Sequence, residues 1–79
     1  MTQYRFVKRL SEGCVVLYSD DYGSQIWARC KIRAAKECYI TGIKLKGKEA
    51  YIPIGSQKYN RMDRISVEGI KYLEEKSYE

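Results

Sequence analysis

Hydrophobic and polar residues alternate from residue 25 to residue 34 more regularly than anywhere else in the chain. Successive side chains of a strand point to opposite faces, so this pattern predicts a half-buried β-strand over 25–34. The even positions are apolar, and we expect them to face the core while the odd positions face solvent. The expected core face is Ile26, Ala28, Cys30 and Ile32, and the expected outer face is Trp27, Arg29, Lys31 and Arg33.

Shorter patterns predict four more strands and one helix. The strands are expected at 4–10, 14–19, 38–46 and 49–54, which are rich in strand-forming residues. Pro53 cannot donate to a strand ladder, so it places its segment at a sheet edge or at a strand end. Ser66 is suited to cap a helix over 66–76, in which apolar residues recur about every three positions.

These segments predict the fold class α+β: a small antiparallel, partly rolled β-sheet of four or five short strands with one C-terminal helix. The length of 79 residues fits one small domain, 1–79. No apolar run approaches about 18 residues, so no membrane span is expected. The first six residues lack the apolar core of a signal peptide, and we expect a cytoplasmic protein.

The cysteine and histidine content argues against metal and nucleophilic chemistry. The chain has three cysteines, Cys14, Cys30 and Cys38, and no histidine. An odd number of cysteines does not suit a disulfide framework, and three thiols without an imidazole cannot complete a tetrahedral zinc site. The usual general base is missing as well. We therefore expect a non-enzymatic protein that uses no metal and no cofactor, and cysteines that serve as small buried apolar residues.

Residues 38–42 have the spacing of a zinc knuckle, with Thr41 in place of the second thiol. A threonine hydroxyl cannot supply the second thiolate that such a site needs. We interpret this segment as a knuckle-shaped turn held by Gly42 and by hydrogen bonds.

Positive charge is concentrated in the middle of the chain. Residues 29–48 hold seven Lys or Arg and one Glu, a net charge of +6 (7 − 1), whereas residues 68–79 carry −2 (2 − 4). A cationic strand face with an exposed Trp27 suits nucleic acid, because cations neutralise phosphates and an indole stacks on an unpaired base. The alternative is an ordinary solvated face, with Trp27 covered by the helix. The candidate binding residues are Trp27, Arg29, Lys31, Arg33, Lys44, Lys46, Lys48, Tyr22 and Tyr59.

Eight tyrosines in 79 residues divide between core and surface. Tyrosine is common at recognition surfaces and also fills the edge of small β-rich cores. We expect Tyr4, Tyr39 and Tyr51, which lie in predicted strands, to belong to the core. Tyr22 and Tyr59 lie in predicted loops and are expected at the surface.

Two functions of different classes follow from these residues. The first is a small basic module that binds nucleic acid or regulates through the Trp/Arg/Lys strand face. The second is a protein-interaction module, such as a small inhibitor or adaptor from a mobile element, whose same face meets an acidic protein. A homodimer formed through an edge strand or the helix is a third alternative.

Three sequence blocks carry a family resemblance. Residues 22–27 read Tyr-Gly-x-Gln-x-Trp, residues 38–42 read Cys-x-x-Thr-Gly, and residues 51–53 read Tyr-x-Pro, followed later by Asn60. In this order they resemble a family of small uncharacterised bacterial proteins, classed as a domain of unknown function. The chain departs from the family in having Lys48 where the family tends to have Asp. The resemblance implies a bacterial source and no established activity.

Overall fold

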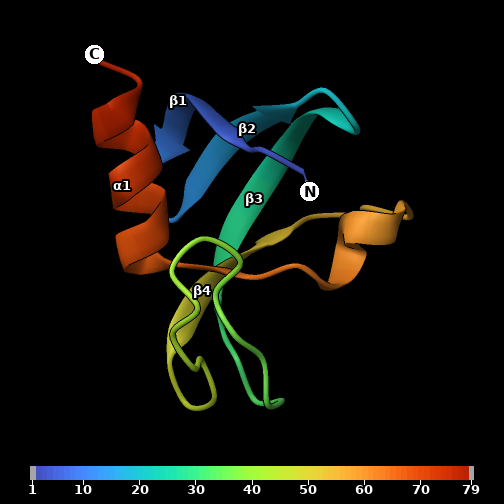
Figure 1. Cartoon of the computed structure of the whole chain (residues 1–79), viewed down its shortest axis with the longest axis vertical. Helices are drawn as coiled ribbons and strands as arrows, with labels where there is room; N and C mark the ends of the chain where they lie inside the picture. Colours follow the sequence, from blue (N-terminus) through green and yellow to red (C-terminus); the bar gives the residue numbers. More distant parts are fainter. Residues whose placement is uncertain (1, 79) are drawn as a thin grey trace.

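Five strands form a single antiparallel sheet, in which they are arranged in the same order as in the sequence. The computed structural model describes residues 2–78. The strands are β1 (Arg5–Ser11), β2 (Cys14–Ser19), β3 (Gly23–Lys31), β4 (Glu49–Pro53) and β5 (Ile65–Ser66), with a 3-10 helix η1 (Tyr59–Met62) before β5 and the helix α1 (Val67–Lys76) after it. The sheet curls into a half-barrel, and α1 contacts β1 at one edge and both β4 and β5 at the other (Figure 1).

The predicted α+β class is confirmed, and so are most of the predicted elements. The strands expected at 14–19 and 49–54 coincide with β2 and β4 within one residue, and those at 4–10 and 25–34 overlap β1 and β3. Ser66 caps α1, since its Oγ accepts a hydrogen bond from the Gly69 amide at 2.9 Å. No helix among the described residues is long and apolar enough to cross a membrane.

The strand predicted over 38–46 is wrong. The chain between β3 and β4 has irregular structure, with a single isolated bridge that pairs Glu37 with Lys44. Gly42 adopts a φ of 77°, which turns the chain within the predicted strand. Two short elements after β4, η1 and β5, were not predicted, because neither contains enough residues to show a period.

The predicted orientation of β3 is also wrong. Trp27 is 0% exposed, whereas Ile26, which we expected in the core, is 45% exposed. In register, Trp27 lies between Val15 of β2 and Pro53 of β4. Its ring meets that of Tyr4 edge-on, with the ring centroids 5.1 Å apart. The alternative in which Trp27 is buried is therefore correct, and the contacts that bury it come from Tyr4 and the neighbouring strands.

Alternation identifies the two faces of a strand but does not say which one is buried. Burying the indole of Trp27 removes more apolar area from water than burying Ile26, so the fold encloses the face that carries the indole. Arg29 and Lys31 share this inner face, but they lie near the end of β3 and reach solvent. Of the expected core set only Ile32 is fully buried, and it lies just beyond β3.

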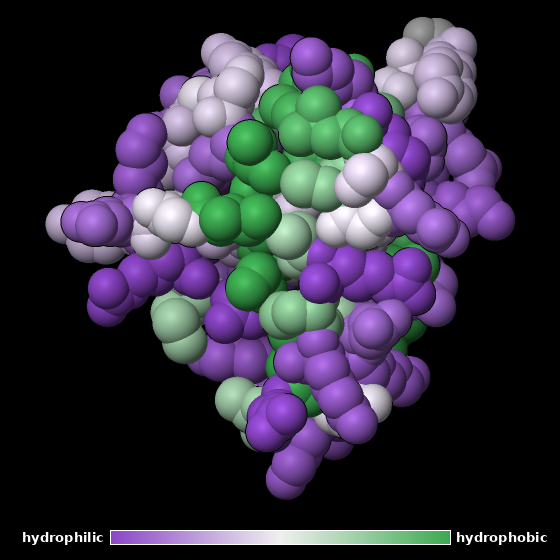
Figure 2. All heavy atoms as spheres, turned by 180° about the vertical axis from the view of Figure 1, so that it is seen from behind, coloured by the Kyte–Doolittle hydropathy of each residue, from purple (hydrophilic) through white to green (hydrophobic). Residues whose placement is uncertain are grey.

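Some apolar side chains remain on the outer face of the sheet. Ile26 and Ile54 are exposed there, and Val16 and Ile52 are half-buried. Figure 2 shows hydrophobic side chains down the middle of this side, flanked by hydrophilic ones. The alternation in the sequence was thus real, but its aliphatic positions line the open face. Of the tyrosines expected in the core, Tyr4 and Tyr51 are buried and Tyr39 is half-buried against it.

Candidate functional site

Residues 31–48, from the end of β3 to the start of β4, form a projection that we call the basic finger. In Figure 1 its chain forms two loops at the lower end of the molecule, and between them it runs back up to a loop in front of β3 and β4. Backbone hydrogen bonds of 2.8 Å join Ile32 to Lys48, Gly47 to Ile32, and Leu45 to Lys36. Ile32 and Leu45 are buried and fix the finger to the core. The finger is therefore a positioned structure, although it is not a regular strand pair.

The finger accounts for the entire formal net charge of the chain. It holds six Lys or Arg residues and one Glu, a net charge of +5 (6 − 1), and the other 61 residues hold nine cations and nine carboxylates, which cancel. Among residues 2–78 there are three ion pairs, and none of them involves a cation of the finger. The six cations are Lys31, Arg33, Lys36, Lys44, Lys46 and Lys48, all exposed except the half-buried Lys36.

The structure brings together five of the nine predicted site residues, places Arg29 beside them and separates the three aromatic ones. Lys31, Arg33, Lys44, Lys46 and Lys48 lie on the finger, together with Lys36, which we had not included among the candidates although it lies within the same charge-rich window. Arg29 lies next to the finger, and its Nε donates to Glu49 Oε1 at 2.9 Å.

The three aromatic candidates do not belong to the finger. Trp27 is in the core and offers no surface for a base. Tyr22 lies at the β2–β3 turn, where its carbonyl accepts a hydrogen bond from Lys58 Nζ at 3.1 Å, next to η1. Tyr59 in η1 is 98% exposed, and Figure 1 places η1 to the side of the molecule, away from the finger. The cationic surface and the exposed tyrosines are separate features.

The expected knuckle-shaped turn is present at 38–42. The Cys38 carbonyl accepts from the Gly42 amide at 2.9 Å, and Cys38 Sγ accepts from the amides of Thr41 and Ser66 at 3.3 and 3.2 Å. Burial disfavours the thiolate, but these hydrogen bonds outweigh it and lower the pKa of Cys38. The turn thereby joins the base of the finger to the start of α1. Residues 2–78 contain no cluster of three Cys, Asp or Glu side chains placed to hold a metal ion.

Two residues of the family-like blocks, Gln25 and Asn60, meet in a buried polar network. Asn60 Nδ2 donates to Gln25 Oε1 at 2.7 Å and to the Tyr4 hydroxyl at 3.1 Å, and that hydroxyl donates to Asp63 at 2.8 Å. Burial raises the pKa of Tyr4 far above its usual range, and the Asp63 carboxylate adds to the rise. The network connects η1 to β3, so the presence of Gln25 and Asn60 is explained by a structural role.

Comparisons of the chain with known protein families, with curated proteins and with solved structures found no match. The resemblance to the family of small bacterial proteins therefore stays a prediction.

Proposed function

We propose that this protein is a binding module that holds nucleic acid through the basic finger. The observation that carries the proposal is the placement of the whole net charge, +5, on one projection whose cations have no carboxylate partners among residues 2–78. Lys and Arg side chains of this kind neutralise phosphates and release counterions, which supplies most of the free energy of sequence-independent binding.

The side chains of the finger favour a duplex over a single strand. Single-strand binding uses exposed aromatic rings on which bases stack. The finger has one aromatic residue, Tyr39, which is half-buried and donates its hydroxyl to the Thr2 carbonyl at 3.0 Å. Phosphates line the outside of a duplex, where Lys and Arg side chains can reach them without unstacking bases. We therefore expect phosphate contacts without base recognition.

One observation favours the second candidate function, binding of an acidic protein surface by a small inhibitor or adaptor. Ile43 on the finger is 41% exposed and lies next to Lys44. An exposed aliphatic side chain among cations suits an interface with an apolar centre and a charged rim. Phosphate contacts by the neighbouring cations do not require it. The two candidates differ in whether Ile43 contributes to binding.

Two triple variants with the same net charge separate the effect of the finger's cations on binding from the effect of overall charge. The finger variant is Lys44→Gln with Lys46→Gln and Lys48→Gln. The control is Lys8→Gln with Arg61→Gln and Lys71→Gln, which are exposed cations outside the finger without side-chain hydrogen bonds to the described residues. Both variants change the net charge from +5 to +2 (5 − 3).

The readout is fluorescence anisotropy with a short labelled duplex. We expect the finger variant to lose most of its affinity and the control to keep it. Equal losses would mean that binding follows net charge and not the finger. Displacement of the duplex by an acidic protein, with Ile43→Ala weakening the binding of that protein but not of the duplex, would support the second candidate.

A further inference from the structure

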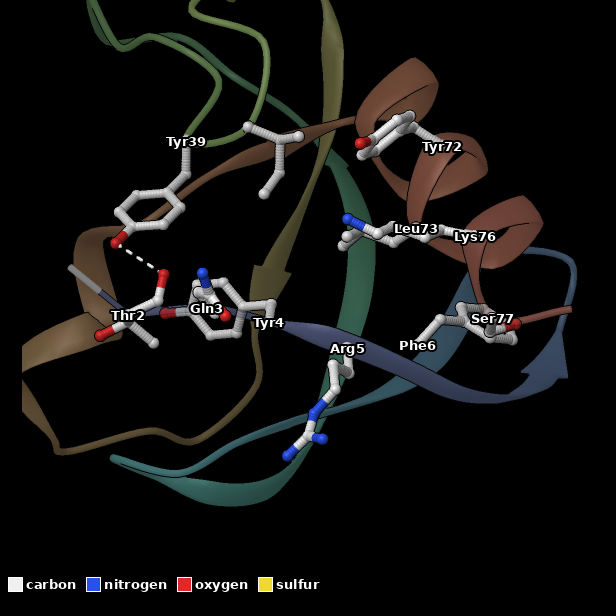
Figure 3. Close-up of a pocket in the computed structure, with 11 residues that line it drawn as sticks. Thr2, Gln3, Tyr4, Arg5, Phe6, Tyr39, Tyr72, Leu73, Lys76 and Ser77 are labelled. Carbon is white, nitrogen blue, oxygen red and sulfur yellow. Dashed lines mark hydrogen bonds between the residues drawn. The ribbon is translucent and has the colours of Figure 1, made fainter. Parts of the chain in front are cut away.

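A groove of about 950 Å³ runs between the start of β1 and the C-terminal half of α1. It lies apart from the cations of the finger, and its walls are aromatic and aliphatic. Figure 3 shows Tyr72 and Leu73 projecting from α1 toward the space that Tyr39 borders from the other side. The apolar lining is Tyr4, Phe6, Tyr39, Ile40, Tyr72 and Leu73. Tyr72 is 54% exposed, so the fold itself does not fill this space.

The groove reaches the backbone of an edge strand. β1 pairs with β2 on one side and is the last strand of the sheet on the other. Five consecutive residues, 2–6, line the groove. Alternate side chains of an extended chain point to opposite faces, so five residues in a row line one groove only where the edge of the backbone faces it. Among the described residues, the backbone groups of residues 2–4 form no backbone hydrogen bond outside the strands.

One cation in the groove, Lys76, forms no ion pair with a carboxylate of residues 2–78. Lys76 projects from α1 into the space, and its Nζ lies 5.8 Å from the centroid of the Tyr72 ring (Figure 3). Arg5, the other cation of the lining, turns away from the groove and pairs with Asp20 over the ring of Tyr18.

We propose that this groove binds an extended acidic segment of a partner protein, which adds to the backbone edge of residues 2–6 at the start of β1, beyond the part of the strand that Arg9 joins to Glu74 of α1. Main-chain hydrogen bonds to β1 supply affinity, an apolar side chain of the segment packs against Tyr72 and Leu73, and a carboxylate pairs with Lys76. The proposal does not depend on nucleic-acid binding, because the residues that form the groove are not those of the finger's cationic surface.

The charge of β1 favours an acidic partner over a second copy of the chain. β1 carries Arg5, Lys8 and Arg9 among its seven residues and no carboxylate. Arg5 pairs with Asp20 and Arg9 with Glu74, whereas Lys8 forms no ion pair within residues 2–78. Pairing of two β1 strands would bring these cations together, and like charges on neighbouring strands are destabilising. Cations on an edge strand also discourage edge-to-edge pairing of identical chains. An acidic strand meets neither obstacle.

Peptide selection provides the probe. Random peptides displayed on phage are selected against the full chain, and the enriched sequences are made as labelled synthetic peptides. We expect these sequences to contain at least one Asp or Glu among apolar residues. Anisotropy then compares the wild type with Lys76→Gln and with the control Lys71→Gln, an exposed change on α1 outside the groove. We expect Lys76→Gln to weaken binding about tenfold and Lys71→Gln to leave it unchanged.

Strand addition is tested on the peptide, so that the protein stays intact. In an added strand, alternate amides point to β1 and the others to solvent. N-methylation of one alternate set should abolish binding, and methylation of the other set should preserve it. Failure to enrich peptides, equal effects of both sets, or binding that ignores Lys76→Gln would overturn the proposal. It would also fail if sedimentation showed a dimer that Lys76→Gln dissociates, because the occupant would then be a second copy.

Discussion

Truncation of Trp27 tests whether the inner face of β3 holds the fold together. The side chain is 0% exposed and packs between Val15 and Pro53 with Tyr4 against its ring. Removing a buried indole leaves a large cavity, and such truncations cost about 3–5 kcal/mol. At about 0.05–0.15 kcal/mol per residue, a chain of this length has a total stability of about 4–12 kcal/mol. Trp27→Ala therefore removes a large part of the free energy of unfolding.

Trp27→Phe adds a second, finer test. Trp27 Nε1 is buried and has no hydrogen-bond partner among the described residues. An unsatisfied buried hydrogen-bond donor costs about 1–3 kcal/mol, and the phenylalanine side chain has no such donor. Removing this cost offsets part of the free-energy cost of the cavity, which is smaller with phenylalanine than with alanine. We expect Trp27→Phe to be much less destabilising than Trp27→Ala.

Urea unfolding followed by far-UV circular dichroism measures both variants, since loss of the single tryptophan would remove a fluorescence signal. Tyr72→Ala serves as the control, because Tyr72 is half-exposed on α1. If Trp27→Ala were no more destabilising than Tyr72→Ala, the inner face of β3 would not be the core. If Trp27→Phe were as destabilising as Trp27→Ala, neither the smaller cavity nor the removal of the unpaired Nε1 donor would stabilise the phenylalanine variant as expected.

Three further predictions concern the core and the knuckle. Gly69→Ala should destabilise the fold by about 1–3 kcal/mol, because the added Cβ would lie 2.8 Å from Ile65 Cγ2. This clash outweighs the helix propensity of alanine, which favours the substitution by about 1 kcal/mol. Thermal unfolding measures the change, and a higher Tm would contradict the packing at this helix turn. The raised pKa of Tyr4 means that the folded state holds its proton more tightly, so stability should fall as the pH rises above about 10, the usual value in the unfolded chain. Urea midpoints at rising pH measure this fall, and Tyr4→Phe should reduce it; an equal fall in Tyr4→Phe would assign it to other groups. In the folded protein iodoacetamide should label the two half-buried cysteines and spare Cys38, which is buried despite its lowered pKa; peptide mass mapping checks this, and early labelling of Cys38 would show that the knuckle opens.

The sequence predicted the elements better than their faces. Strong signals such as the alternation over 25–34 and the Ser66 cap depend on neighbouring residues, and both correspond to observed elements. Which face of β3 is buried depends on the curl of the sheet and on Tyr4, which lies far away in sequence. Local patterns do not contain that contact. The strand predicted over 38–46 failed for a local reason, since Gly42 turns the chain in the middle of its short alternation.

The candidate site could be predicted in charge but not in shape. The excess of cations over 29–48 is visible in the sequence, and most of them do lie on one projection. We expected these cations to share one exposed surface with Trp27. The face of β3 that carries Trp27 is instead buried at that residue. The groove beside β1 combines residues from the start of the chain, the knuckle and the end of α1. Only the tertiary fold brings these segments together.

The salt dependence of duplex binding tests the central claim, that the finger contacts phosphates, most directly. The plot of log K against log salt has a negative slope, which is steeper by about 0.9 for each phosphate contact. The triple change of Lys44, Lys46 and Lys48 to Gln should therefore make the line shallower by about 2.7. The control triple of Lys8, Arg61 and Lys71 should run parallel to the wild type. Parallel lines for wild type and the finger variant, or wild-type affinity that does not change with salt, would contradict the account.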